Sequence, residues 1–164
     1  MVIRQAVLSL LKEQTIDKIT VADVCRLSEI NRATFYRHYE NQYGVLFEME
    51  DDLLEQVPPV QDSEERLQTI FQTFEAKKGE WELLLSARLE ESFSTKLYRA
   101  FLDWFPLRQP SPRRELRHSF LLHGLSGLLV HWAAGGFREP AQEIAGHAIQ
   151  LLHDLMGEGD PSLI

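Results

Sequence analysis

The segment TVADVCRLSEINRATFYRHY, residues 20–39, constrains the fold more than any other part of this 164-residue chain. Thr20 and Asp23 have the spacing of a capping box, in which a hydroxyl and a carboxylate satisfy free backbone N–H groups where a helix begins. Asn31 is a favourable residue for capping a second helix. The pattern therefore predicts two short helices joined by a tight turn. The expected ranges are 20–27 and 31–38.

Two such short helices bury little surface alone and are typical of the helix-turn-helix, whose second helix enters the major groove of DNA. Phe35 and Tyr39 lie four positions apart, so both are expected to face the core. Arg can bond guanine and a Thr methyl can contact thymine, whereas Tyr and His suit phosphate oxygens. These residue types are present on the opposite face, which holds Arg32, Ala33, Thr34, Tyr36, Arg37 and His38.

Residues 3–47 resemble the DNA-binding domain of the TetR (tetracycline-repressor) family. Ile19-Thr20 matches the start of the family's second helix, and Ile30-Asn31 matches the residues before its recognition helix. Thr34 to Tyr39 fits the family's Thr-aromatic-Tyr-x-His-aromatic pattern, and Tyr43 to Leu46 resembles the start of the following helix. The resemblance implies a homodimeric transcriptional regulator, expected to be a repressor, that binds a palindromic operator in double-stranded DNA. The DNA-binding residues it implies are Thr20, Asn31, Arg32, Ala33, Thr34, Tyr36, Arg37, His38 and Gln42.

Four features depart from the family's pattern. Glu29 occupies a turn position that is usually Gly, and Ser28 precedes it where Ala is common. Gln42 stands where a Lys often contacts phosphate, and few residues precede Arg4, where many members have a basic arm. A residue other than glycine costs more in the turn geometry that glycine favours. These differences bear on DNA affinity more than on the fold.

The net charge of −8 is unusual for a DNA-binding protein, but it is unevenly distributed. Residues 1–44 hold six basic and five acidic side chains, so the remainder of the chain carries −9. Local charge, rather than the total, governs attraction to phosphate. We therefore expect the acidic remainder to stay away from DNA while the N-terminal part approaches it.

The rest of the chain shows helical periodicity and lacks the period-two alternation and hairpin turns of strands. Pro58-Pro59 should stop one helix, Gly79 should end another, and Ser111-Pro112 should begin a third. The expected fold class is all-α, with a helix-turn-helix domain over 1–44 and a helical regulatory and dimerisation domain over 45–164. The further expected helices are 2–13, 41–57, 63–78, 80–105 with a break near 86–90, 112–134 and 140–156.

Two apolar helices near the C-terminus are expected to join two copies of the chain. Gly124 to Trp132, together with Gly136-Phe137 and Pro140, resembles the last two helices of some TetR-family members. In the family, those helices pair with their symmetry mates in a four-helix interface. The dimer residues expected on this basis are Leu121, Leu125, Leu128, Trp132, Ile144, Ala148, Leu151 and Leu155.

An aromatic cluster in the middle of the chain allows two interpretations. The rings suit a hydrophobic core, and they also suit the apolar lining of a ligand pocket. TetR-family members often hold a ligand between the middle helices, so the resemblance implies a small apolar effector, with His123 as a polar contact. The pocket residues under this interpretation are Phe71, Phe74, Trp81, Tyr98, Phe101, Trp104 and His123.

Several other classes of function are disfavoured. Cys25 is the only cysteine, so no disulfide is expected, and core packing explains this residue better than redox sensing. His118, His123 and His131 do not share one helical face, so neither a metal site nor a cofactor is expected. No nucleophile elbow or phosphate loop indicates an enzyme. No apolar run reaches the length of a membrane span, and a cytoplasmic location is expected.

Two alternatives to an effector-controlled repressor stay open. The same fold could bind DNA without a small-molecule effector, under the control of a protein partner or of its own abundance. It could also be an interaction protein that has lost DNA binding. That last interpretation is supported only by Glu29, Gln42 and the short N-terminal arm.

Overall fold

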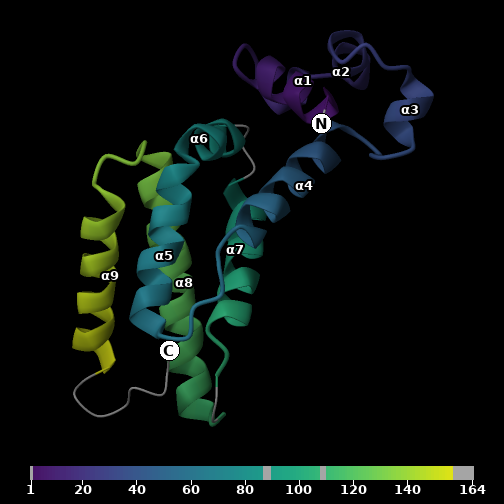
Figure 1. Cartoon of the computed structure of the whole chain (residues 1–164). Helices are drawn as coiled ribbons and strands as arrows, with labels where there is room; N and C mark the ends of the chain where they lie inside the picture. Colours follow the sequence, from purple (N-terminus) through teal and green to yellow (C-terminus); the bar gives the residue numbers. More distant parts are fainter. Residues whose placement is uncertain (1, 87–89, 108–109, 157–164) are drawn as a thin grey trace.

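The computed structural model describes residues 2–86, 90–107 and 110–156, without the side chains of 86, 90–92 and 156. The described residues form helices and no strand, which confirms the all-α fold class. None of the described helices is both long enough and apolar enough to cross a membrane. The elements (Figure 1) are α1 (Val2–Leu11), the 3-10 helix η1 (Ile16–Lys18), α2 (Val21–Leu27), α3 (Arg32–Tyr36), α4 (Gln42–Glu55), α5 (Ser63–Ala76), α6 (Lys78–Ser86), α7 (Glu90–Trp104), α8 (Pro112–Ala134) and α9 (Ala141–Met156).

Side chains cap several helices at the positions that the sequence indicates. Asn41 Oδ1 accepts a hydrogen bond from the Gly44 N–H at 3.1 Å where α4 begins. Asp62 Oδ1 accepts one from the Glu65 N–H at 2.9 Å at the start of α5, and Ser111 caps α8. Each cap satisfies a backbone donor that the helix itself leaves without a partner. Local chemistry therefore determines where these helices begin.

Two local predictions differ from the structure. The sequence predicts that Gly79 ends a helix, whereas the structure places it in the first turn of α6 and puts the break at Lys77. The Lys77 N–H still bonds to the Phe74 carbonyl at 3.1 Å, and Lys77 alone separates α5 from α6. Residues 16–18 lie in the connection between the expected helices 2–13 and 20–27. They form η1, because three residues suffice for one 3-10 turn. Residues 87–89, where a break is predicted, lie outside the described residues.

The first three α-helices and η1 form a small unit, which we name the head (residues 2–41). Val7 of α1, Val24 of α2 and Phe35 of α3 are fully buried, and α2 packs on both α1 and α3. Ile16 and Ile19 are also buried and close the core from the η1 side. Because a core of this size is small, the loss of one such side chain would disturb the orientation of α3.

The helices α5 to α9 form a bundle, which we name the body. Figure 1 shows α9 beside α5 and α7 beside α8. Phe74 and Trp81 stack with their ring centroids 4.4 Å apart, and Phe93 lies 4.9 Å from Trp81. Phe71 contacts Trp132 at 5.4 Å. These aromatic contacts join helices α5 to α8 in one core.

The helix α4 connects the head to the body (Figure 1). It packs on α1 of the head and on α7 of the body. Val45 and Leu46, near its start, are fully buried. The domain boundary expected between residues 44 and 45 falls inside α4, which begins at Gln42. The division into 1–44 and 45–164 stays a prediction, and α4 is the covalent connection between the two parts.

Candidate nucleic-acid interface

The predicted capping box is present at the start of α2. Thr20 Oγ1 accepts a hydrogen bond from the Asp23 N–H at 3.2 Å, and Asp23 Oδ2 accepts one from the Thr20 N–H at 3.1 Å. The Thr20 hydroxyl also donates to this carboxylate at 2.6 Å. These bonds lower the pKa of Asp23. Thr20 is exposed, but its hydroxyl proton points to Asp23, so donation to a phosphate requires that bond to break.

The turn between α2 and α3 contains a strained residue. Glu29 has a φ of 56°, in the left-handed region that favours glycine. Ser28 Oγ donates to the Val24 carbonyl at 2.6 Å, and the Ile30 N–H donates to the Cys25 carbonyl at 3.1 Å. Ser28 and Cys25 are both buried. Packing and hydrogen bonds on either side therefore impose the unfavourable backbone geometry on Glu29.

We expect Glu29→Gly to raise the free energy of unfolding by about 0.5–1 kcal/mol, because glycine adopts a positive φ without steric cost. The Glu29 side chain is exposed, so little packing is lost. Urea unfolding followed by circular dichroism measures the change.

Phe137→Gly is the matched control for this prediction. Phe137 also has a positive φ, 52°, but its buried ring packs on Trp132 with centroids 4.7 Å apart. Loss of this ring should lower the free energy of unfolding by about 3 kcal/mol, although the substitution also relieves the backbone strain. A lower stability of Glu29→Gly would contradict the assignment of strain to the turn.

The helix α3 turns one apolar side inward and the rest outward. Phe35 is fully buried, and its ring packs edge-on against Tyr36 and at a tilt against Tyr39, with both centroid distances 5.7 Å. Asn31 Oδ1 caps the helix by accepting the Thr34 N–H at 2.7 Å. Figure 1 shows α3 at the outer edge of the head. The buried Phe35 ring thus sets which side chains face outward.

Eight of the nine predicted DNA-binding residues lie in the short stretch from Asn31 to Gln42, which holds α3 and the first residue of α4. Thr34 and Gln42 are half-buried, and Gln42 is the first residue of α4. The other predicted side chains are exposed: Thr20, Asn31, Arg32, Ala33, Tyr36, Arg37 and His38. Tyr36 keeps 56% of its surface exposed although it is a large aromatic residue. The exposed Tyr36 ring packs against the buried Phe35 ring, so it is fixed in place and available to contact a partner.

Sequence reasoning missed a hydrogen bond that fixes the loop beside this surface. The Tyr43 hydroxyl donates to Asp17 Oδ1 at 2.5 Å and joins η1 to the first turn of α4. This bond raises the pKa of Tyr43. Lys18, next in the chain, is an exposed cation of the head. No local pattern relates residues that lie 26 positions apart, so only the fold reveals this contact.

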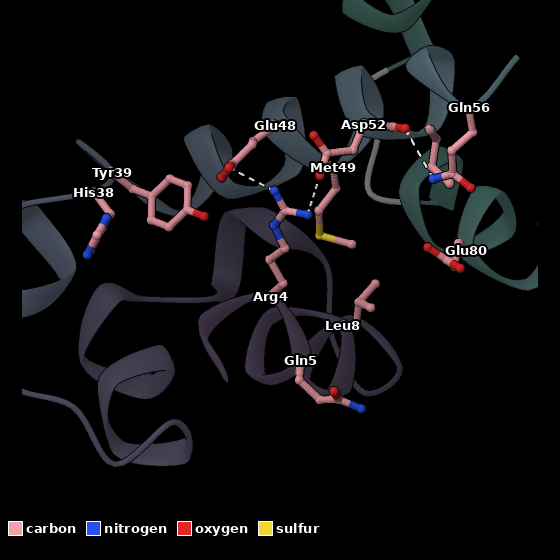
Figure 2. A pocket seen from close by; sticks show the side chains of 11 residues that line it. Arg4, Gln5, Leu8, His38, Tyr39, Glu48, Met49, Asp52, Gln56 and Glu80 are labelled. Atoms are coloured by element: carbon pink, nitrogen blue, oxygen red, sulfur yellow. Dashed lines mark hydrogen bonds and ion pairs between the residues drawn. The ribbon is translucent and has the colours of Figure 1, made fainter. Parts of the chain in front are cut away.

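A charged network seats the head on α4 (Figure 2). Arg4 of α1 forms an ion pair with Glu48 at 2.7 Å and another with Asp52. A hydrogen bond with Tyr39 lowers the pKa of Glu48, while burial and the same bond raise the pKa of Tyr39. These residues line an open groove of about 680 Å³, to which Glu80 of α6 also contributes. The segment that follows α3 is therefore connected to α4 through polar contacts.

The structure places most of the predicted dimer residues inside the chain's own core. The buried ones are Leu121, Leu125, Trp132 and Ala148, and the half-buried ones are Leu128 and Ile144. Only Leu151 and Leu155 are exposed, by 55% and 57%. The exposed positions of α8 and α9, rather than the buried ones, are those available to a second chain.

Sequence reasoning did not single out two further exposed apolar side chains. Leu116 and Phe120 of α8 are 74% and 68% exposed. They lie at the same end of the body as Leu151 and Leu155, because the Arg117 guanidinium reaches the Leu155 carbonyl at 3.5 Å. We name Leu116, Phe120, Leu151 and Leu155 the apolar end patch. Periodicity could not find it, since α8 carries apolar residues on two sides and only the packing shows which side is covered.

The residues predicted to line an effector pocket differ in burial. Phe71, Phe74, Trp81 and Phe101 are fully buried, Tyr98 and Trp104 are half-buried, and His123 is exposed. The Tyr98 and His123 rings stack at 3.9 Å where α7 meets α8. His123 Nδ1 lies 2.8 Å from the Ser119 carbonyl, so this nitrogen donates and carries the proton. Tyr98 and His123 therefore meet at the surface between α7 and α8.

Comparison with solved structures identifies the fold. The chain superposes on a TetR transcriptional regulator from Streptococcus agalactiae with a TM-score of 0.62 and 24% identity, covering 92% of this chain and 91% of that one. A TetR-family regulator from Streptomyces coelicolor gives a TM-score of 0.60 and 17% identity, covering 99% and 86%. The dihydroxyacetone kinase operon activator DhaS gives 0.63 and 14%, covering 94% and 93%. No family model and no curated protein matches the chain in sequence. The chain therefore has the fold of the TetR-family transcriptional regulators.

Proposed function

We propose that this chain is a sequence-specific DNA-binding transcriptional regulator that binds a palindromic site as a homodimer. The observation that carries the proposal is the outward face of α3, where Arg32, Tyr36 and Arg37 are exposed while Phe35 is fully buried. Two guanidinium groups and a phenol on this short helix and its C-cap residue Arg37 match the chemistry of base edges and phosphates. The fold shared with TetR-family regulators supports the proposal.

Charge supports a dimer rather than a single head as the unit that binds DNA. The head has a small charge excess, and one of its cations, Arg26, forms an ion pair with Asp23 at 3.3 Å. A single head therefore attracts phosphate only modestly, while the acidic body repels it. Two heads about 34–36 Å apart would occupy successive major grooves and add their contacts.

The apolar end patch supports a second copy of the chain as the partner of α8 and α9. Its four large side chains are more than half exposed, and large apolar side chains exposed near one another are typical of interaction sites. In a two-fold symmetric dimer, a patch near the axis packs against the same patch of the other chain. A small patch on each chain therefore contributes twice to the buried interface. The predicted residues Leu151 and Leu155 belong to this surface.

Selection of duplexes from a random DNA pool by the purified protein tests the proposal. We expect enrichment of one inverted repeat whose half-sites are centred about 10–10.5 base pairs, or a multiple of this, apart. Affinity for the enriched duplex should fall steeply with salt. Enrichment of no sequence, with weak binding of all duplexes even at low salt, would instead favour an interaction protein that has lost DNA binding.

We propose repression as the mode of control, because occupancy of an operator is sufficient to block transcription and needs no further contact. One similar structure is named as an operon activator, so transcription in vitro from a template that carries the selected site is the deciding assay. We propose no enzymatic activity for the chain.

A small effector is the second element of the proposal. The stacked Tyr98 and His123 rings offer an apolar face beside a hydrogen-bonding nitrogen, which suits a small, mostly apolar molecule. A compound that binds only the folded state raises the melting temperature in a thermal-shift screen. An effector must also weaken DNA binding. If no compound both raises the melting temperature and weakens DNA binding, a regulator without a small-molecule effector is favoured.

A further inference from the structure

Glu50 is a buried carboxylate on the helix that joins head and body. Its side chain is 1% exposed. Among the described residues, neither of its carboxylate oxygens has a hydrogen-bond partner. Burial of a carboxylate without hydrogen bonds is costly, and an interior position of α4 could hold an apolar residue instead. This carboxylate therefore calls for an explanation beyond packing.

The ammonium group of Lys96, on α7 of the body, holds one turn of α4. Lys96 Nζ donates to the Phe47 carbonyl and to Asp51 Oδ1, both at 2.7 Å, and lies 3.3 Å from Glu50 Oε2. The same nitrogen lies 5.0 Å from the centroid of the Phe47 ring. A single side chain of the body thus contacts three residues of α4. Among the described residues, Glu50 is the one charged partner of Lys96 that is strongly buried.

The other side of α4 is held by the head. Arg4 of α1 pairs with Glu48 and Asp52, which lie one helical turn apart (Figure 2). The acidic residues of this turn are therefore divided, with Glu48 and Asp52 facing the head and Glu50 and Asp51 facing Lys96 of the body. Because α4 carries the head, the contact with Lys96 is one place where the body restrains it, beside the groove that Arg4 of the head and Glu80 of α6 line together.

The charge state of Glu50 is sensitive to conditions near neutral pH. Burial raises the pKa of Glu50 to about 7, and the attraction of Lys96 opposes this rise only in part. Among the described side chains, the charged groups that act on Glu50 are Lys96 of α7 and Asp51 of α4 itself. A proton on Glu50 removes one of the two carboxylates that hold the ammonium group.

We propose that the contact between Lys96 and Glu50 is a latch that fixes the head relative to the body and that a proton on Glu50 opens. This inference rests on the proposed DNA-binding function, since the latch acts on that function by setting the positions of the two recognition helices. With Glu50 protonated, Lys96 keeps its bonds to the Phe47 carbonyl and to Asp51 but loses its buried ionic partner. The head is then held less tightly and samples more orientations, and DNA binding must restrict this motion. DNA affinity consequently falls as the pH drops through about 7.

Stability changes in the opposite direction. Because the folded-state pKa of Glu50 lies above its ordinary value of 4.5, the folded state binds this proton more tightly than the unfolded chain. The charged form therefore destabilises the fold in full above pH 7. This cost decreases as the pH falls below the folded-state pKa and is gone only below the ordinary value of 4.5. Glu50→Gln, which mimics the protonated acid, should raise the melting temperature at pH 8 by about 3–8 °C and change it little at pH 5.

The test compares wild type and Glu50→Gln for binding of the duplex selected by the wild-type protein. At pH 8, we expect the variant to bind about 5- to 20-fold more weakly although it is more stable. At pH 6, the two proteins should differ by less than about twofold, because both carry a neutral side chain. A merely structural role would make the more stable variant bind equally well. Equal affinities of both proteins at pH 8 would overturn the latch.

A second measurement does not depend on DNA. Nitroxide labels at Glu13→Cys in the head and Gln72→Cys in the body, both exposed, report their separation by pulsed electron resonance. The Cys25→Ala background and dilution with unlabelled protein keep the distances within one chain. We expect a narrow distance distribution at pH 8 and a broad one at pH 6 for wild type, and a broad one at both for Glu50→Gln. Identical widths throughout would refute the latch, whereas failure of the duplex selection alone would refute only the proposed function.

Discussion

Tyr36→Ala is expected to weaken binding of the selected duplex by about 30- to 100-fold. Each recognition helix would lose a phenol that contacts phosphate or base, at about 1–1.5 kcal/mol, and the symmetric dimer loses it twice. The fold should be unaffected, because Tyr36 is 56% exposed and its neighbour Phe35 remains in the core. Fluorescence anisotropy measures affinity, and thermal unfolding measures the fold.

Tyr36→Phe is the control that separates the hydroxyl from the ring. This variant keeps the edge-on packing against Phe35 but removes the hydrogen-bonding group, so an intermediate loss is expected. An unchanged affinity for Tyr36→Ala, with the melting temperature also unchanged, would remove α3 as the DNA-reading helix.

Phe120→Glu is expected to convert the dimer to a monomer and to lower operator affinity by at least about 1000-fold. A glutamate on each side of the two-fold axis places like charges in an apolar contact. A monomer engages one half-site, so its affinity approaches that of non-specific binding. Phe120 is 68% exposed, and the helix content of the chain should therefore be retained. Sedimentation velocity at micromolar concentration gives the oligomeric state.

Two further variants make this prediction specific. Leu155→Glu, on the other helix of the apolar end patch, should have the same effect as Phe120→Glu. Gln72→Glu adds the same charge at an exposed site of α5 and should leave both dimer and affinity unchanged. A Phe120→Glu protein that sediments as a dimer would show that the two chains meet elsewhere.

Features encoded by local chemistry could be predicted from the sequence. The capping residues Thr20, Asn31 and Asn41 mark the starts of their helices, because each accepts a backbone N–H three residues ahead. The inward position of Phe35 and the outward position of Tyr36 follow from helical spacing on a short helix with one covered side.

Features that depend on long-range packing could not be predicted. Leu121 and Leu125 share an apolar row of α8, but only the fold shows that the body itself covers this row. The strain at Glu29 could be anticipated from the residue type, whereas the link between Lys96 and Glu50 joins elements 46 positions apart and has no local signature. The proposed DNA-binding surface could therefore be predicted from short motifs, whereas the proposed latch depends on tertiary contacts and could not.

Hydroxyl-radical footprinting of the wild-type protein on its selected duplex tests the central claim most directly. Two recognition helices about 34–36 Å apart should protect two patches on one face of the duplex, separated by one helical turn and related by two-fold symmetry. The Tyr36→Ala protein at the same concentration should leave both patches unprotected. A single protected patch, or uniform weak protection that Tyr36→Ala retains, would contradict a homodimer that reads DNA through α3.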